Sequence, residues 1–172
     1  DLGEDPQSFT AETSINSQES IGRWLLPNTW GGTVPSSTWT FSMNYEVSNA
    51  AGARIQNATA TVSIGSKTFS QELDQGSSFL AQGAGSLTFD IDVETLTASG
   101  SSNIELELTV QAVVFSVPAT DAKLEFLWGS EDKDSSIEAT IPLVDILMVE
   151  PEVEGSDVYL AVRLDSPWGL ST

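Results

Sequence analysis

The chain has 172 residues, with 25 Asp and Glu against 6 Lys and Arg, and it contains no His and no Cys. Without His and Cys there is no Ser-His-Asp or Cys-His catalysis, and zinc, haem and iron–sulfur clusters lose their usual ligands. Oxygen ligands remain, and these suit hard cations such as Ca²⁺. We therefore predict that the protein is not an enzyme, although a hydrolase with two catalytic carboxylates stays compatible with the composition.

The net charge of −19 has consequences for partners and location. It repels the phosphates of nucleic acids and opposes docking on anionic lipid. It suits a salty or Ca²⁺-rich medium, where screening weakens the repulsion between carboxylates. No apolar run is long enough to span a membrane. We predict a secreted or cell-surface protein with no nucleic-acid partner and no membrane insertion within these residues; an acidic cytosolic protein is the alternative.

The first twenty residues differ in composition from the rest. Residues 1–20 contain five acids and no base, together with Gly3, Pro6 and many polar side chains. Such a segment has too little apolar surface to become ordered by burial. The sequence predicts a flexible acidic arm or linker over 1–20, followed by a single domain over 21–172.

From Ile21 onward, apolar and polar residues alternate with the period of a β-strand. Residues 39–47 alternate throughout, and 60–64 lead through Gly65-Ser66 into 68–73, which is the pattern of a hairpin. Nine or ten short strands predict an all-β fold, an antiparallel β-sandwich of jelly-roll or immunoglobulin-like type. Further strands are predicted at 87–93, 104–110, 111–117, 123–128, 136–141, 143–149 and 157–164.

Negative charge is concentrated in the second half, where residues 87–172 hold 17 acids and 3 bases. If 87–110 forms one hairpin with its loop near Gly100, acids of its two strands face each other and destabilise the pair. Such a face requires salt, Ca²⁺ or a cationic partner; a solvated face that prevents edge aggregation is the alternative. This predicted acidic ladder consists of Asp90, Asp92, Glu94, Glu105 and Glu107.

A second acidic concentration lies at 131–138, between two predicted strands. Its alternating oxygen-bearing residues share the D-x-D-x-S opening of calcium loops but lack the central Gly and the distal Glu of an EF-hand. A polar hairpin loop is the alternative. The pattern makes Ca²⁺ the one cofactor that the sequence suggests, with Asp132, Asp134, Ser136 and Glu138 as candidate ligands.

Five Trp residues suggest sugar binding, because flat aromatic faces stack on sugar rings. Trp39 and Trp128 share strand faces with apolar neighbours, which predicts core positions. Trp24, Trp30 and Trp168 lie in segments bounded by Gly and Pro, so we take them as candidate ligand-binding residues. Capping of the open end of the sandwich is the alternative for these three.

The segment 143–149 is apolar on both faces except for Asp145, which predicts a central strand. The carboxylate then lies at a bulge or edge, or it pairs with Arg54, Arg163 or a cation.

These observations favour a non-catalytic extracellular or cell-surface β-sandwich module that binds a glycan, another ligand or a protein partner, assisted by Ca²⁺. A structural subunit of a filament, sheath or capsid-type assembly is the alternative, with the arm 1–20 adding to a neighbour's sheet edge. A glycoside hydrolase with a carboxylate pair is a third class.

Overall fold

The computed structural model describes residues 7–26, 29–48, 53–73, 80, 83–114, 123–129, 135–141, 145–154 and 157–165, the last two ranges by their backbone. Every regular element in these residues is a β-strand, and all of the strands pair antiparallel. The predicted all-β, antiparallel class is confirmed.

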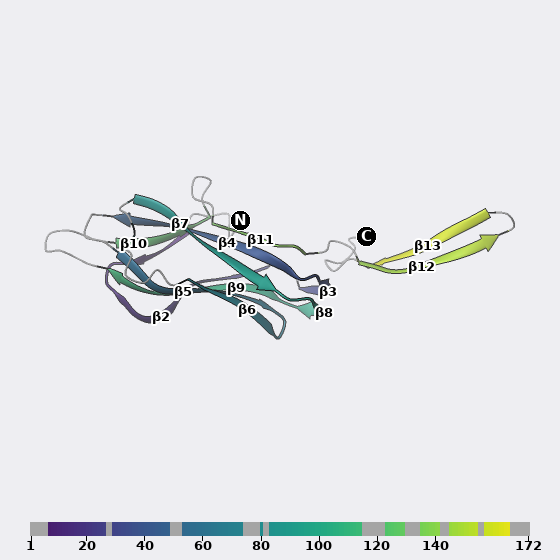
Figure 1. Cartoon of the computed structure of the whole chain (residues 1–172), viewed down its shortest axis with the longest axis horizontal. Coiled ribbons are helices and arrows are strands. Elements are labelled where there is room, and N and C mark those ends of the chain that lie inside the picture. Colours follow the sequence, from purple (N-terminus) through teal and green to yellow (C-terminus); the bar gives the residue numbers. More distant parts are fainter. Residues whose placement is uncertain are drawn as a thin grey trace.

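Two larger sheets form the body of the molecule (Figure 1). The strands of the first sheet are β1 (Gln7–Ala11), β10 (Lys123–Trp128), β4 (Ser37–Ser48), β7 (Gly83–Val93) and β11 (Ser136–Glu138). In this sheet, β11 pairs with residues 40–42 of β4, beside the section of β4 that pairs with β10. The second sheet has the order β2 (Ile15–Leu25), β9 (Ile104–Val114), β5 (Ala53–Ile64) and β6 (Lys67–Leu73).

Two strand pairs stand outside these sheets. The first pair is β3 (Trp30–Val34) with β8 (Leu96–Ser102), and the second is β12 (Asp145–Glu154) with β13 (Asp157–Asp165). Among the described strands, each member of these pairs has the other as its sole partner.

The pairing of the first ten strands is nested. β5 pairs with β6, β4 with β7, β3 with β8, β2 with β9, and β1 with β10. Two further pairings, β4 with β10 and β5 with β9, assemble these pairs into the two sheets. The chain thus runs as one long antiparallel double strand. From the innermost pair outward, its sections belong to the second sheet, the first sheet, the separate pair β3 with β8, the second sheet and the first sheet.

The two sheets share one apolar core, built from the buried alternate residues of each strand. In β9 every second residue from Ile104 to Val114 is buried. Trp24 of the second sheet connects the layers, because its ring centroid lies 6.0 Å from that of Phe41 and 5.4 Å from that of Trp128, both in the first sheet.

The predicted hairpin around Gly65-Ser66 is confirmed. β5 and β6 are joined by these two residues, and Ile64 pairs with Lys67 across the turn. Gly65 has a φ of +59°, a left-handed conformation that favours glycine in two-residue hairpin turns. The predicted strands at 39–47, 87–93, 104–110, 123–128 and 157–164 also lie within observed strands.

The prediction of a flexible arm over 1–20 is wrong for the residues that the structure describes there. β1 pairs with β10, and β2 begins at Ile15 and pairs with β9. Ala11 and Ile15 belong to the core. β1 and β2 lie at the edges of the two sheets. A few apolar residues are enough to attach an edge strand, and its other residues can be polar. The composition of 1–20 therefore resembles that of a linker.

Two other predicted arrangements are also wrong. The segment 87–110 is not a hairpin, because β7 and β9 lie in different sheets. The residues between them form a further strand, β8. The segment 111–114 continues β9 rather than starting a new strand.

The strand that contains 145–149 is not central, since β12 pairs with β13 alone among the described strands. Its bulge lies between Ile146 and Met148, and Asp145 is opposite Asp165, at the end of this pair.

Candidate functional site

The structure does not place Trp24 or Trp30, the two candidate tryptophans among the described residues, on an open surface. Trp30 is fully buried in β3, which contradicts its candidacy as a ligand-binding residue. Trp24 is half-buried against Phe41 and Trp128. For Trp24 and Trp30, the positions agree with the capping alternative. Trp168 lies outside the described residues, and Trp39 and Trp128 are buried as predicted.

The predicted acidic ladder is divided between the two sheets. On β7, Asp90 accepts a hydrogen bond of 2.9 Å from the Thr40 hydroxyl, and Asp92 accepts one of 2.8 Å from the Thr38 hydroxyl. Glu94 follows β7 and is exposed. The carboxylates of the two halves therefore do not face each other, which corrects the predicted pairing.

The other half of the ladder, on β9, shares one guanidinium between its two carboxylates. Arg23 of β2 lies 3.2 Å (Nε) from Glu105 and 3.0 Å (Nη2) from Glu107. Hydrogen bonds from Ser20 and then from Arg23 hold the pKa of the Glu107 carboxyl below its ordinary value. The hydrogen bond to Glu107, followed by the charge of Glu105, raises the pKa of Arg23. This cluster consists of paired surface charges, as expected of a structural feature of the sheet.

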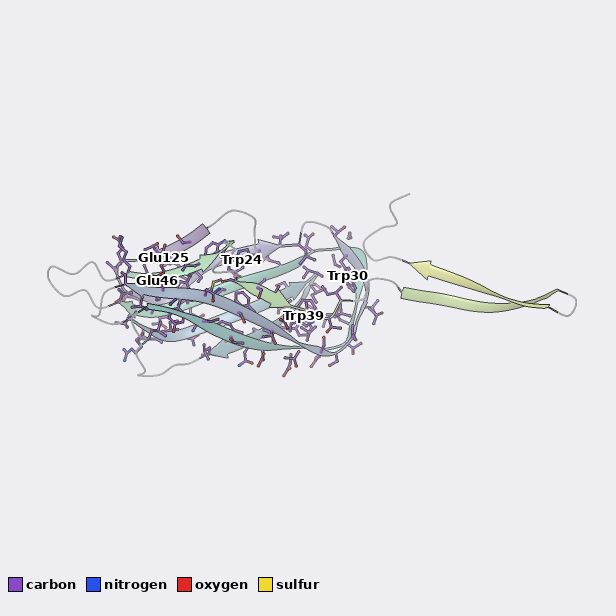
Figure 2. All side chains as sticks on the ribbon, turned by 90° about the horizontal axis from the view of Figure 1, so that it is seen from above. Trp24, Trp30, Trp39, Glu46 and Glu125 are labelled. Carbon is purple, nitrogen blue, oxygen red and sulfur yellow. The ribbon has the colours of Figure 1, made fainter. Side chains whose placement is uncertain are left out.

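A true like-charge pair occurs where the sequence did not indicate one. Glu46 of β4 is opposite Glu125 of β10, and both lie at one end of the body, with Trp30 and Trp39 towards the other end (Figure 2). Nearby, the Lys123 ammonium is 3.0 Å from the Glu12 carboxylate. Finding the Glu46–Glu125 pair requires the register of β4 against β10, which the periodicity of the sequence does not give.

The candidate calcium ligands are described in part. Ser136 and Glu138 lie on β11, opposite Ser42 and Thr40 of β4. Asp132 and Asp134 lie outside the described residues. Across the described ranges, no group of three or more Asp or Glu residues is placed to hold a metal ion. Calcium binding by 131–138 stays a prediction.

A groove of about 620 Å³ lies where the turn between β5 and β6 meets β8. We call it the β8 groove. In Figure 1, β8 and the start of β6 lie at the end of the body from which β12 and β13 extend. The lining of the β8 groove consists of Ile64, Gly65, Ser66, Lys67, Thr95, Leu96, Thr97, Ala98, Ser99, Ser101, Ser102 and Asn103.

The wall of the β8 groove is fixed by backbone contacts. The Gly65 amide donates a hydrogen bond of 2.9 Å to the Asn103 carbonyl, which joins the turn to the end of β8. A Cβ on Gly31 would lie 2.3 Å from the Gly100 Cα, closer than two such atoms can approach. At position 31, therefore, only glycine allows β3 to lie this close to β8. Behind this wall, Trp30 is the register partner of Ser102.

The charge of the β8 groove differs from that of the chain. Its lining includes no Asp or Glu and one base, Lys67, on a protein of net charge −19. Lys67 is exposed, and no carboxylate of the described residues forms an ion pair with it. Sequence reasoning missed this site because separate Ser and Thr residues carry no signal until the fold places 64–67 beside 95–103.

Comparison with known proteins adds no family: no protein-family model matches the sequence, and no curated protein is significantly similar to it. Within the described ranges, no helix has the length and apolarity to cross a membrane.

Proposed function

We propose that this protein is a non-catalytic, extracellular or cell-surface jelly-roll module that binds an acidic saccharide, one carrying carboxylate or sulfate groups, in the β8 groove. The observation that carries the proposal is the charge of this groove, which has one lysine and no acid on a strongly acidic chain. The acidic, Cys-free composition supports a location outside the cell.

The jelly-roll assignment is supported by the nested pairing. A jelly roll has two antiparallel sheets formed by Greek-key connections. Rolling up one long double strand gives the orders β1-β10-β4-β7 and β2-β9-β5-β6. In an immunoglobulin-type sandwich the first two strands are neighbours in one sheet, whereas β1 and β2 belong to different sheets here.

The chemistry of the lining supports a saccharide. Ser and Thr hydroxyls both donate and accept hydrogen bonds, as the hydroxyls of sugars do. Leu96 and Ala98 supply apolar surface for the C–H faces of a sugar ring. The Lys67 ammonium adds a charge-assisted hydrogen bond to a carboxylate or sulfate, and no acid in the lining opposes that anion.

The test is a titration of the protein with a galacturonate oligomer and with a galactose oligomer of equal length, followed by NMR and calorimetry. We expect binding of the acidic oligomer, with shifted amide signals at residues 64–67 and 95–103. Lys67→Ala should weaken it by about tenfold or more, since hydrogen bonds to charged groups contribute about 1.5 to 3 kcal/mol.

Lys123→Ala is the matched control, because it removes the same charge from a lysine paired with Glu12, away from the β8 groove. Equal losses in both variants would mean that net charge, and not the groove, governs binding. Equal binding of the two oligomers would refute the role of Lys67.

Calcium assistance is the second part of the proposal, carried by the 131–138 sequence alone. An ion that binds the folded state raises the melting temperature by mass action. Millimolar CaCl₂ should therefore raise Tm above that in NaCl of equal ionic strength, and an unchanged Tm would remove calcium from the proposal while leaving the saccharide site untouched.

A further inference from the structure

The pair β12 and β13, which we call the ribbon, lies apart from the two sheets. Both views show it extending beyond the end of the body (Figures 1 and 2), and it pairs with no other described strand. A two-stranded ribbon alone is marginally stable in water and needs a third strand or a packed face for stability. The ribbon therefore requires a surface to cover one of its faces.

The register sorts the residues of the ribbon into two faces, because residues directly opposite in an antiparallel pair share a face. One face, the acidic face, carries Glu150, Glu152 and Glu154, with Arg163 as its base. The other, the apolar face, carries no charged or polar residue. It consists of four pairs: Ile146 with Leu164, Val149 with Val162, Pro151 with Leu160, and Val153 with Val158.

The bulge in β12 lies between Ile146 and Met148, so Ile146 is opposite Leu164 and shares the face of Val149 and Val162. All eight residues that the register places on this face are apolar in the sequence. A row of this length without charge, on a chain of net charge −19, is the pattern of a contact surface.

The described body offers no surface to receive the apolar face. Its one strongly exposed large apolar side chain is Leu25, at 53% exposure, and its outer sheet faces are polar. The apolar face of a second ribbon, in contrast, has the same length, the same shape and no charge to bury.

We propose that two copies of this chain associate through the apolar faces of their ribbons. Eight residues that each bury about 60 to 120 Å² give roughly 500 to 1,000 Å² per copy. Stable complexes bury about 800 Å² per partner. The two ribbons stack as a small four-stranded sandwich around a twofold axis, with both acidic faces outward. This association is separate from the saccharide site.

The test is sedimentation of the full chain at about 100 µM in 0.5 M NaCl, which screens the repulsion between acidic copies. We expect a dimer. Leu160→Glu places a charge on the apolar face and should weaken association at least about tenfold, as for a central interface residue. Ala161→Glu adds the same charge to the acidic face, one residue away, and should leave the dimer intact.

A second measurement applies even if Leu160→Glu disrupts the ribbon itself. Because the chain has no Cys, one introduced thiol is the sole thiol. Val162→Cys on the apolar face should form an intermolecular disulfide under mild oxidation, and Ala161→Cys should not. A monomeric wild-type chain, an assembly of more than two copies, equal effects of the two Glu variants or equal cross-linking of the two Cys variants would overturn the proposal.

Discussion

The outer faces of the two sheets and the β8 groove use polar residues in opposite ways. On the outer faces, Asp90 and Asp92 accept hydrogen bonds from threonine hydroxyls, and Arg23 lies between Glu105 and Glu107. The β8 groove has hydroxyls and one ammonium but no carboxylate. A strongly acidic composition thus coexists with a surface free of acids, and the arrangement of the charges, more than their sum, determines what each surface binds.

The largest expected effect concerns the support behind the β8 groove. Trp30→Ala should lower the free energy of unfolding by about 3 to 5 kcal/mol, the usual range for removing a buried large aromatic. Trp30→Phe should cost about 1 kcal/mol, because the Trp30 Nε1 is buried without a hydrogen-bond partner among the described residues. Urea unfolding measures both. A loss for Trp30→Phe well above about 1 kcal/mol would contradict the absence of a partner for the indole N–H.

A smaller effect is expected at the crossing of β3 and β8. Gly31→Ala should cost about 1 to 3 kcal/mol and also weaken saccharide binding, because the added methyl meets the backbone of Gly100 and displaces the groove wall. Gly100→Ala is the matched control, since a Cβ there meets no atom within 4 Å. Thermal unfolding and the saccharide titration distinguish the two. A stable Gly31→Ala variant would contradict the close approach of these strands.

On the outer face of the first sheet, the effects should be weaker. Replacing Thr38 and Thr40 together by Val removes two hydrogen bonds to exposed carboxylates and should cost less than about 1 kcal/mol, with binding in the β8 groove unchanged. Thr88→Val is the control, because its hydroxyl has no hydrogen bond to a described carboxylate. Lost saccharide binding in the double variant would mean that this face and the groove are not independent.

The smallest effect is a change in one pKa. Arg23→Gln should raise the pKa of Glu107 part of the way towards its ordinary value, because the hydrogen bond from Ser20 remains. A folded-state pKa below the unfolded one stabilises the protein above the unfolded pKa, and this contribution is lost as the pH falls through the folded pKa. Carboxyl NMR titration of Glu107 measures the shift. Ser20→Ala should produce a shift in the same direction, and an unchanged pKa in both variants would contradict the proposed causes.

The sequence predicted which residues form strands far better than which strands are neighbours. The alternation in 39–47 and 104–110 identifies a buried face, and burial confirms it. Alternation does not identify the partner strand, so 87–93 and 104–110 were paired with each other although each belongs to a different sheet. The two-residue turn at Gly65-Ser66 was predictable because it is local.

The candidate site was less predictable for a related reason. The β8 groove combines two segments separated by about thirty residues, and none of its Ser or Thr residues is distinctive alone. Trp30 was a candidate because Gly31 and Gly32 follow it, which resembles a loop. These glycines instead belong to β3, where Gly31 allows the close approach to β8.

The nested pairing also constrains how the chain acquires its structure. β5 and β6 are separated by two residues, so they close at the least entropic cost, and we expect them to form the folding nucleus. We expect each outer pair then to close a loop already shortened by the pair inside it, in the order β4 with β7, β3 with β8, β2 with β9 and finally β1 with β10. Most contacts in the structure nevertheless join distant parts of the sequence, which is the property of slowly folding domains. Folding should therefore be slow, and the edge of β10 should be the last to be covered.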